Sequence, residues 1–239
     1  GSLEMELRLQ SRAVKGAIDQ ATELLQHRRV VACMGDRLAL ICLCLTEPIQ
    51  PVVQGAATTE EEGFQLVLRT QPDLLICSSD LESGYGIDLI KRVKAELPTC
   101  QLLIVLVRET QAVVQEAMEA FADGVIFKSS LGTGRGDFIQ ALQTIAQGGV
   151  YYPNEIRRLG FQTPRSDLPA LVEELSEREV EVVEAVARGL TNKSVADALG
   201  ISVETVKTHV MNAMGKIGAR DRTQLAVMAM AYGLIDPMA

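Results

Sequence analysis

The sequence predicts two folded domains: an α/β domain built on a five-stranded, doubly wound parallel sheet, and an all-α domain after it. Between residues 30 and 146, short apolar runs alternate with longer amphipathic stretches, which is typical of consecutive βα units. After residue 173, helical stretches are separated by glycine and serine residues that can end one helix and cap the next. At roughly 150 residues per domain, the length of 239 residues predicts one and a half to two compact domains.

The composition is that of an ordinary globular protein. Hydrophobic residues make up 47% and charged residues 23% of the chain, so intrinsic disorder is disfavoured. The longest apolar stretch, residues 38–45, is much shorter than the roughly 20 residues of a membrane-spanning helix, and no signal-peptide pattern is present. We therefore expect a cytoplasmic protein that has no membrane partner.

The cysteine and histidine content argues against a metal centre and against nucleophilic catalysis. The five cysteines are odd in number and have no CxxC spacing, so neither a disulfide framework nor a zinc site is expected. The two histidines, His27 and His209, offer little material for a Ser-His-Asp triad. We expect no enzyme activity, no catalytic residue, no metal and no cofactor. Buried structural cysteines are favoured over a redox sensor at Cys42 and Cys44.

The first predicted element is an amphipathic helix within residues 3–28. Its apolar residues are spaced near three and four apart, as on one face of a helix; they are Leu7, Val14, Ile18, Ala21 and Leu25. This face can pair with the same face of a second chain or pack on its own domain, and the sequence leaves both alternatives open.

The α/β domain is predicted at residues 29–150. Its strands are expected at 30–34, 51–56, 74–77, 102–107 and 125–127. Its helices are expected at 37–45, 60–70, 86–96, 111–122 and 137–146. The glycine-rich stretch 132–137 lacks the Lys-Ser/Thr ending of a P-loop and is interpreted as a loop. Residues 151–172 are predicted to be a linker, because prolines, arginines and an asparagine gather there without periodicity.

The all-α domain, predicted at residues 173–239, has strong helix start and stop signals. Ser176 and Glu179 are spaced as a capping box that begins a helix. A short helix over 191–199 follows, and Gly200 with Ser202 supplies a turn and a new N-cap for the next helix. Helix, tight turn and helix is the plan of the helix-turn-helix.

The helix that begins after Ser202 has one apolar and one polar face. A wheel at about 100° per residue places on one side the residues that we expect to be buried: Val203, Val206, Val210, Ala213, Met214 and Ile217. The opposite stripe holds Glu204, Thr208, Met211 and Gly215, flanked by Lys207 and Asn212. These residue types can contact base edges and phosphates, although a helical protein-interaction domain has a similar pattern.

Residues 175–235 carry a series of short motifs without a gap. They are Leu175-Ser-Glu-Arg-Glu179, Gly189-Leu-Thr-Asn-Lys193, Val195-Ala196, Leu199-Gly-Ile-Ser202, Thr205-Val-Lys-Thr-His209 and Arg220-Asp-Arg-Thr-Gln224, with Asn212, Lys216 and Gly218 between them. With these motifs the segment resembles the LuxR-type helix-turn-helix of bacterial response regulators.

The resemblance implies sequence-specific binding to double-stranded DNA, with the helix that begins near Val203 in the major groove. By position in the family motif, the groove-reading residues are Lys207, Thr208 and Met211, and the phosphate contacts are Asn192, Lys193, Thr205 and Arg220. Asn212 and Lys216 complete the expected DNA-binding set. The last helix, residues 222–234, pairs two subunits in the family, so a homodimer is expected. Met211 and Gly215 depart from the usual residues, so the base preference of relatives does not carry over.

The βα pattern ahead of this domain has a few fixed points: Pro72-Asp73, Gly86, Ala122-Asp-Gly124 and Lys128. With them, residues 29–149 resemble the receiver domain of response regulators, which implies a flavodoxin-like strand order. A working receiver accepts a phosphoryl group on an aspartate that ends the third strand. That aspartate and an acidic pair that ends the first strand hold Mg²⁺.

The resemblance places residues of other types at most positions of this phosphorylation pocket. Met34 and Gly35 align with the acidic pair, Ser78 with the acceptor, Leu106 with the hydroxyl residue of the fourth strand, and Val125 with the aromatic switch position. Only Lys128 matches the family. The resemblance therefore implies a pseudo-receiver with a degenerate pocket. The alternative is a shifted register that brings Asp36 and Asp80 into the pocket.

Together these features predict a bacterial transcription regulator of the two-component response-regulator type that binds DNA without phosphorylation. The net charge of −8 requires that DNA contacts come from a local basic patch. One alternative is a protein-interaction partner that titrates other regulators and has little DNA affinity. Another is a phosphorylatable receiver that uses Asp80 and Asp36. An input from a protein partner or a small molecule at the receiver-like domain also stays open.

Overall fold

The computed structural model describes residues 12–131, 137–162 and 164–239. It divides into two compact units: the described residues of 1–108 and 126–146 form one, and residues 109–125 and 147–239 form the other. The predicted N-terminal helix is observed as α1 (Arg12–Leu25), while residues 3–11 of that prediction and the loop residues 132–136 lie outside the described residues. In the described part of the chain, no helix is long and apolar enough to cross a membrane.

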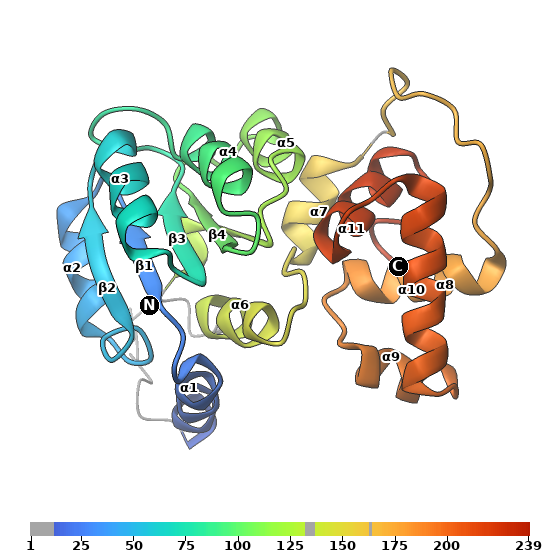
Figure 1. The fold of residues 1–239 in the computed structure, drawn as a ribbon, viewed down its shortest axis with the longest axis horizontal. Helices are drawn as coiled ribbons and strands as arrows, with labels where there is room; N and C mark the ends of the chain where they lie inside the picture. Colours follow the sequence, from blue (N-terminus) through green and yellow to red (C-terminus); the bar gives the residue numbers. More distant parts are fainter. Residues whose placement is uncertain (1–11, 132–136, 163) are drawn as a thin grey trace, which may run out of the picture. The chain divides into compact units, whose positions relative to one another are not determined.

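The centre of the α/β domain is a five-stranded parallel sheet with the strand order β2-β1-β3-β4-β5 (Figure 1). The strands are β1 (Val30–Cys33), β2 (Val53–Ala57), β3 (Leu74–Ser78), β4 (Gln101–Leu106) and β5 (Gly124–Phe127). In the pairing of β1 with β3, Val30 lies opposite Leu74 and Cys33 lies opposite Cys77. Every residue of β1, β3 and β5 is buried, as expected for a sheet covered on both faces. The predicted doubly wound sheet and its flavodoxin-like order are confirmed.

Four helices of this domain begin and end as the sequence predicts: α2 (Arg37–Leu45), α3 (Glu60–Thr70), α4 (Gly86–Glu96) and α6 (Asp137–Ala146). Side-chain caps fix two of their starts, because the Ala39 amide donates to Asp36 and the Glu62 amide donates to Thr59. Helix α1 packs on α6 of its own domain, with Ala21 and Leu25 of α1 buried. The apolar face of α1 could pair with a second chain or pack on its own domain. In the structure, it packs on its own domain.

The structure differs from the prediction at the start of β2 and at the end of α5 (Gln111–Glu119). Strand β2 begins at Val53 instead of residue 51, because the amides of Val52 and Val53 both donate to the Ile49 carbonyl in a turn. Helix α5 ends three residues early, because Phe121 has a left-handed φ of 59° that no α-helix continues.

The predicted linker contains a helix, α7 (Asn154–Gly160), that the sequence analysis did not predict. Its seven residues are too few to show a helical period, but it is well packed in the second unit. The Ile156 side chain is fully buried, and an added Cβ on Gly160 would lie 2.5 Å from Sδ of Met118 in α5. The buried Arg157 guanidinium donates to the carbonyls of Tyr152 and Pro237, each at 2.7 Å. This part of residues 151–172 is therefore folded structure and not a simple connector.

The remaining helices of the second unit are α8 (Glu177–Ala187), α9 (Asn192–Leu199), α10 (Val203–Ile217) and α11 (Arg222–Ala231). The resemblance to the family predicts that the last helix pairs two subunits. In the structure, most of its apolar residues are buried: Leu225, Ala226, Val227, Ala229, Met230 and Ala231. Met228 and Tyr232 of this segment are partly exposed, and pairing of two chains through α11 stays a prediction.

Candidate nucleic-acid interface and receiver pocket

The helix-turn-helix is built by side-chain caps and left-handed glycines. The Ser194 amide donates to Thr191 at 3.2 Å, and the Thr205 amide donates to Ser202 at 3.1 Å, so hydroxyl caps begin α9 and α10. Gly200 ends α9 with a φ of 65°, a conformation that a side chain would disfavour. These local signals fix the angle at which α10 follows α9.

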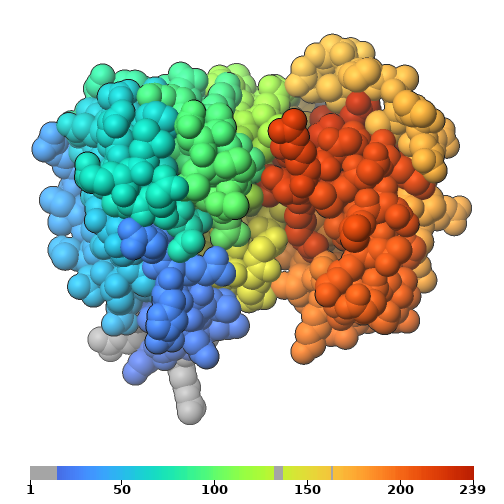
Figure 2. All heavy atoms as spheres, in the orientation of Figure 1, coloured from blue at the N-terminus to red at the C-terminus, as the bar shows by residue number. Residues whose placement is uncertain are grey.

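Helix α10 has one buried and one exposed face; of the six residues expected to be buried, Val203 and Met214 are only partly buried. Val206, Val210, Ala213 and Ile217 are buried. We define the reading face as the exposed side chains of α10 on the other side: Glu204, Lys207, Thr208, Met211 and Asn212. Residues of this part of the chain, orange to red in Figure 2, lie at the molecular surface. Met211 is 71% exposed, so the reading face includes a large apolar side chain.

The only lysine of the reading face is held by a neighbouring carboxylate. Nζ of Lys207 lies 3.1 Å from Oε1 of Glu204, one helical turn earlier, and the two side chains are 53% and 82% exposed. The Thr208 hydroxyl donates to the Glu204 carbonyl at 3.0 Å, which holds Thr208 against its own helix. The reading face of the free protein is therefore close to electrically neutral.

The predicted phosphate contacts lie at the start of α9, in the first turn of α10 and in the loop before α11. Asn192 is the first residue of α9, and its side-chain oxygen accepts a hydrogen bond of 2.6 Å from Arg222. Lys193, Thr205 and Arg220 are exposed. Burial lowers the pKa of Arg222, whose guanidinium also donates to the Leu190 carbonyl at 2.6 Å.

Lys216 differs from the other predicted DNA-binding residues. Its side chain is only 18% exposed, and its Nζ lies 2.9 Å from a carboxylate oxygen of the buried Glu179 in α8. Burial raises the pKa of Glu179, but the hydrogen bonds from Lys216 and from the Ser176 amide outweigh it, so the pKa lies below its ordinary value. In the structure, Lys216 forms an ion pair that joins α8 to α10, and a DNA contact by Lys216 stays a prediction.

At the carboxyl ends of β1 and β3, a hydrogen-bonded loop fills the space next to Gly35. The Gly35 amide donates to Oγ of Ser78 at 3.2 Å, and the Ser78 hydroxyl donates to the Asp80 carbonyl at 2.9 Å. A Cβ added to Gly35 would lie 2.7 Å from the Asp80 carbonyl oxygen and 2.9 Å from Cα of Leu81. Since both are backbone atoms, this position accepts no side chain without a shift of the loop.

The two acids near this pocket are both engaged by cations. Asp36 caps α2 and lies 3.4 Å from Nζ of Lys128, and the Ala39 amide, followed by the Lys128 ammonium, lowers the pKa of Asp36. Asp80 lies 3.2 Å from Nε of Arg108. Each pair is about half exposed.

The three residues at the predicted metal-binding positions of the pocket carry no carboxylate. Met34, Gly35 and Ser78 supply one thioether, no side chain and one hydroxyl, while Mg²⁺ binds through carboxylate and other hard oxygen ligands. Leu106 and Val125 are fully buried in the sheet. No group of three or more His, Cys, Asp or Glu side chains that could hold a metal occurs among the described residues.

Comparisons with known proteins identify both domains. Residues 173–229 match the family described as bacterial regulatory proteins, luxR family, and residues 37–141 match the response regulator receiver domain. A nitrate/nitrite response regulator protein homolog of Haemophilus influenzae is 31% identical over 167 residues, which are 70% of this chain and 78% of that protein. The chain belongs to the LuxR-family response regulators. It is a DNA-binding transcription regulator of the response-regulator type.

Other relatives of this response regulator agree with the assignment. The transcriptional regulatory protein LnrK of Bacillus subtilis is 29% identical over 192 residues, covering 76% of this chain and 86% of that protein. The structure of the two-component response regulator RcsB in a complex with DNA has a TM-score of 0.50 at 20% identity, over 85% of this chain and 98% of the other, which supports the fold alone. The match to the receiver family begins at residue 37, after Met34 and Gly35.

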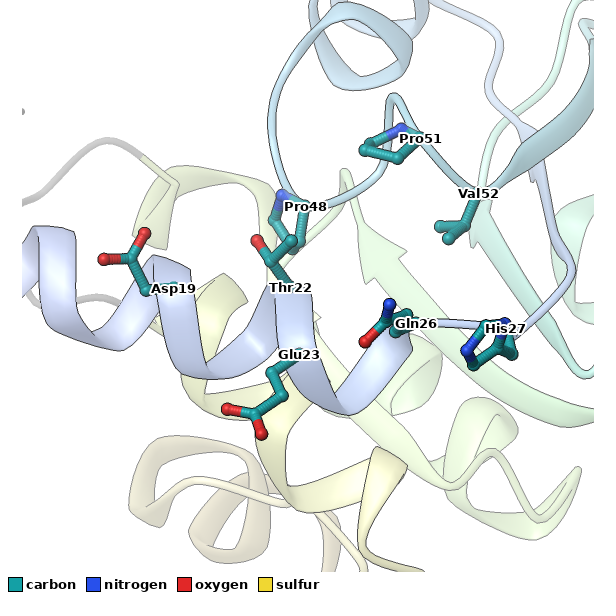
Figure 3. A pocket seen from close by; sticks show the side chains of 8 residues that line it. All are labelled: Asp19, Thr22, Glu23, Gln26, His27, Pro48, Pro51 and Val52. Atoms are coloured by element: carbon teal, nitrogen blue, oxygen red, sulfur yellow. The ribbon is translucent and has the colours of Figure 1, made fainter.

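The response regulator also has a cavity that the sequence analysis did not find. It measures about 430 Å³ and lies between α1 and the loop before β2 (Figure 3). Its lining residues are Asp19, Thr22, Glu23, Gln26, His27, Pro48, Pro51 and Val52. None of the predicted site residues lines it. These residues have no common motif and meet only through the tertiary structure, so sequence patterns give no signal for the cavity.

Proposed function

We propose that this response regulator binds a specific double-stranded DNA site through the reading face of α10, and that it does so without aspartyl phosphorylation. The observation that carries the proposal is the space next to Gly35, where the backbone of Asp80 and Leu81 lies within 3 Å of any added Cβ. A carboxylate ligand for Mg²⁺ at this position is incompatible with the observed loop.

In the proposed complex, the residues of the reading face and of the neighbouring helix ends have separate roles. Lys207, Thr208 and Met211 contact base edges in the major groove, with Asn212 beside them. Met211 is suited to an apolar contact with a thymine methyl group. Phosphates are bound by Asn192, Lys193, Thr205 and Arg220, which set the position of the domain on the duplex.

Phosphorylation independence also agrees with the state of the remaining pocket residues. The Ser78 hydroxyl donates a hydrogen bond to the Asp80 carbonyl, and a serine there offers no carboxylate for an acyl phosphate. Lys128 forms an ion pair with Asp36 at the start of α2. We propose that Lys128 has a structural role in this chain.

We further propose that the regulator is a homodimer that pairs through α2. Leu38, Ile41 and Leu45 are 72%, 55% and 72% exposed and lie three and four residues apart on one face of α2. An exposed apolar stripe of this kind marks an interaction surface. Cys42 is exposed on the same face, so a short bis-maleimide linker should join two copies through Cys42. The C42S variant should give no such product, and a wild-type chain that stays uncrosslinked and monomeric in light scattering would contradict this surface.

The first test is selection of bound sites from fragmented genomic DNA by the purified, unphosphorylated chain. Enrichment of a site with two related half-sites is the expected result. In parallel, the intact mass is measured after incubation with acetyl phosphate and Mg²⁺, and it should not change. A mass increase of one phosphoryl group that D80N abolishes would instead support the alternative receiver chemistry at Asp80 and Asp36.

A second candidate function is that of a protein-interaction partner with little DNA affinity. Residues 173–239 carry seven lysines and arginines against ten aspartates and glutamates, so this domain is acidic, and Lys207 is paired with Glu204. Both facts oppose binding to a polyanion. Recovery of no DNA by the full chain, together with stable complexes with other regulators, would favour this function.

A further inference from the structure

Arg222 is a partly buried cation whose hydrogen-bond partners are neutral. It is the first residue of α11, and its guanidinium donates to the Leu190 carbonyl and to Oδ1 of Asn192, each at 2.6 Å. In the part of the chain that the structure describes, no carboxylate lies within ion-pair distance of it, and burial is the one cause of its pKa shift. Withdrawing an arginine from water without a carboxylate partner is costly, so its two short hydrogen bonds call for an explanation.

The chemistry of the guanidinium determines which way the Asn192 amide points. A guanidinium has only N–H donors, so the atom of Asn192 that faces it must be the carbonyl oxygen. The NH₂ group of the same amide then points away from Arg222. In the described residues this NH₂ group donates no hydrogen bond, and the Asn192 side chain is partly exposed.

The place of Asn192 in the fold gives this outward NH₂ group a use. Asn192 begins α9 directly after its cap Thr191, beside the exposed Lys193 and Ser194. Anions are favoured at this end of a helix, where backbone amides and the helix dipole are positive. Asn192 is also one of the predicted phosphate contacts.

We propose that Arg222 is a positioning residue for DNA binding: it locks the Asn192 amide with its NH₂ group outward, ready to donate to a backbone phosphate. The inference rests on the proposed DNA binding and names one residue of its machinery that no family motif position suggested as a DNA contact. Arg222 itself does not touch DNA. The second bond, to the Leu190 carbonyl, fixes the guanidinium at two points and so prevents it from rotating with the amide.

Locking the amide in advance raises affinity, because the side chain is already ordered before DNA arrives. A free asparagine would lose rotamer freedom on binding and would present oxygen or nitrogen to the phosphate with similar ease. An outward oxygen would repel the phosphate. A lysine at position 222 would not serve equally well, because an ammonium lacks the planar fork that reaches Leu190 and Asn192 together.

The test is a double-mutant cycle on the full-length chain with a DNA site recovered from the genomic selection. N192A removes the donor, and we expect a loss of affinity of about tenfold, as for one hydrogen bond to a charged group. R222M should lose less, about two- to fivefold, because the freed amide still presents its NH₂ group in part of the population. The double variant should lose no more than the larger single loss, because both act through the same contact. R178M is the control: it removes an arginine from the same domain whose partner is Glu181, and its affinity should stay near that of wild type.

A purely structural role of Arg222 would give a different pattern. In that case R222M lowers the unfolding temperature, and its effect on affinity multiplies with that of N192A. The N192D variant separates the two further, since its carboxylate still accepts from Arg222 but has no donor. It should keep the unfolding temperature at or above that of wild type and lose at least as much DNA affinity as N192A. If the wild-type chain binds DNA but the losses of N192A and R222M multiply in the double variant, the inference is overturned and the proposed function stands. The same holds if R222M or N192D binds as tightly as wild type. Absence of DNA binding by the wild-type chain would overturn the proposed function and this inference with it.

Discussion

Replacing Glu204 with glutamine should strengthen DNA binding and make it more sensitive to salt. The carboxylate of Glu204 is 82% exposed on the reading face and lies 3.1 Å from Nζ of Lys207. Wild-type protein must break or neutralise this pair when Lys207 approaches DNA, and the carboxylate itself is repelled by the phosphates. Glutamine has the same size and no charge, so the substitution tests the charge alone.

The magnitude follows from counterion release. Each phosphate that a cation neutralises adds about −0.9 to the slope of log K against log salt, so freeing one lysine should steepen the slope by about one. Raising the salt from about 50 to 200 mM should then cost the variant roughly three- to fourfold more affinity than it costs wild type. At the lower salt, E204Q should bind about two- to fivefold more tightly than wild type, because it has no surface ion pair to break.

The assay is fluorescence anisotropy of a labelled duplex at four or more salt concentrations. E181Q is the matched control, because it removes a carboxylate that pairs with Arg178 at the same i,i+3 spacing in α8 and at 2.7 Å. E181Q should leave the slope unchanged. If E204Q has the slope of wild type, or shifts it no more than E181Q does, then Lys207 does not meet phosphate or base as proposed.

Three further predictions concern the reading face, the helix packing and the pocket. M211K should steepen the salt slope by about one and lower the discrimination between specific and random DNA, since an ammonium replaces an apolar contact; anisotropy with both duplexes measures this. E179Q should lower the unfolding temperature at pH 7, because the buried partner of Lys216 loses its charge. The pKa of Glu179 in the folded chain lies below its ordinary value of 4.5, so the stabilisation is complete above about that pH. The difference between wild type and E179Q should shrink as the pH falls further, and a constant difference in melting temperature from pH 7 to 3 would contradict the assignment. G35D should destabilise the α/β domain by about 1–3 kcal/mol in urea unfolding, since its Cβ would lie 2.7 Å from the Asp80 carbonyl oxygen, and an unchanged midpoint would mean that the loop moves freely.

Much of the fold is determined by local sequence signals. The caps Asp36, Thr59, Ser176 and Ser202 begin helices where the sequence indicates, because a short polar side chain accepts from a backbone amide two or three residues on. The alternation of apolar runs with amphipathic stretches predicted the order of the strands and helices. The sequence likewise predicted the buried and exposed faces of α10, since a helical period places them without reference to any neighbour. The DNA-binding and pocket residues were named from motif positions, and their roles stay predictions.

The tertiary structure alone decided which of these side chains are free to act. Lys216 and Lys207 are the same residue type on the same helix, yet one meets the buried Glu179 of another helix and the other meets an exposed carboxylate one turn away. No pattern in the sequence indicates the pairing of Arg222 with Asn192, thirty residues earlier, or the loop of Asp80 and Leu81 that fills the space beside Gly35. Nor does any pattern reveal which apolar side chains of α11 are buried. The physical reason is that caps and periodicity act between residues a few positions apart, whereas burial and ion pairing depend on segments that only the folded chain brings together.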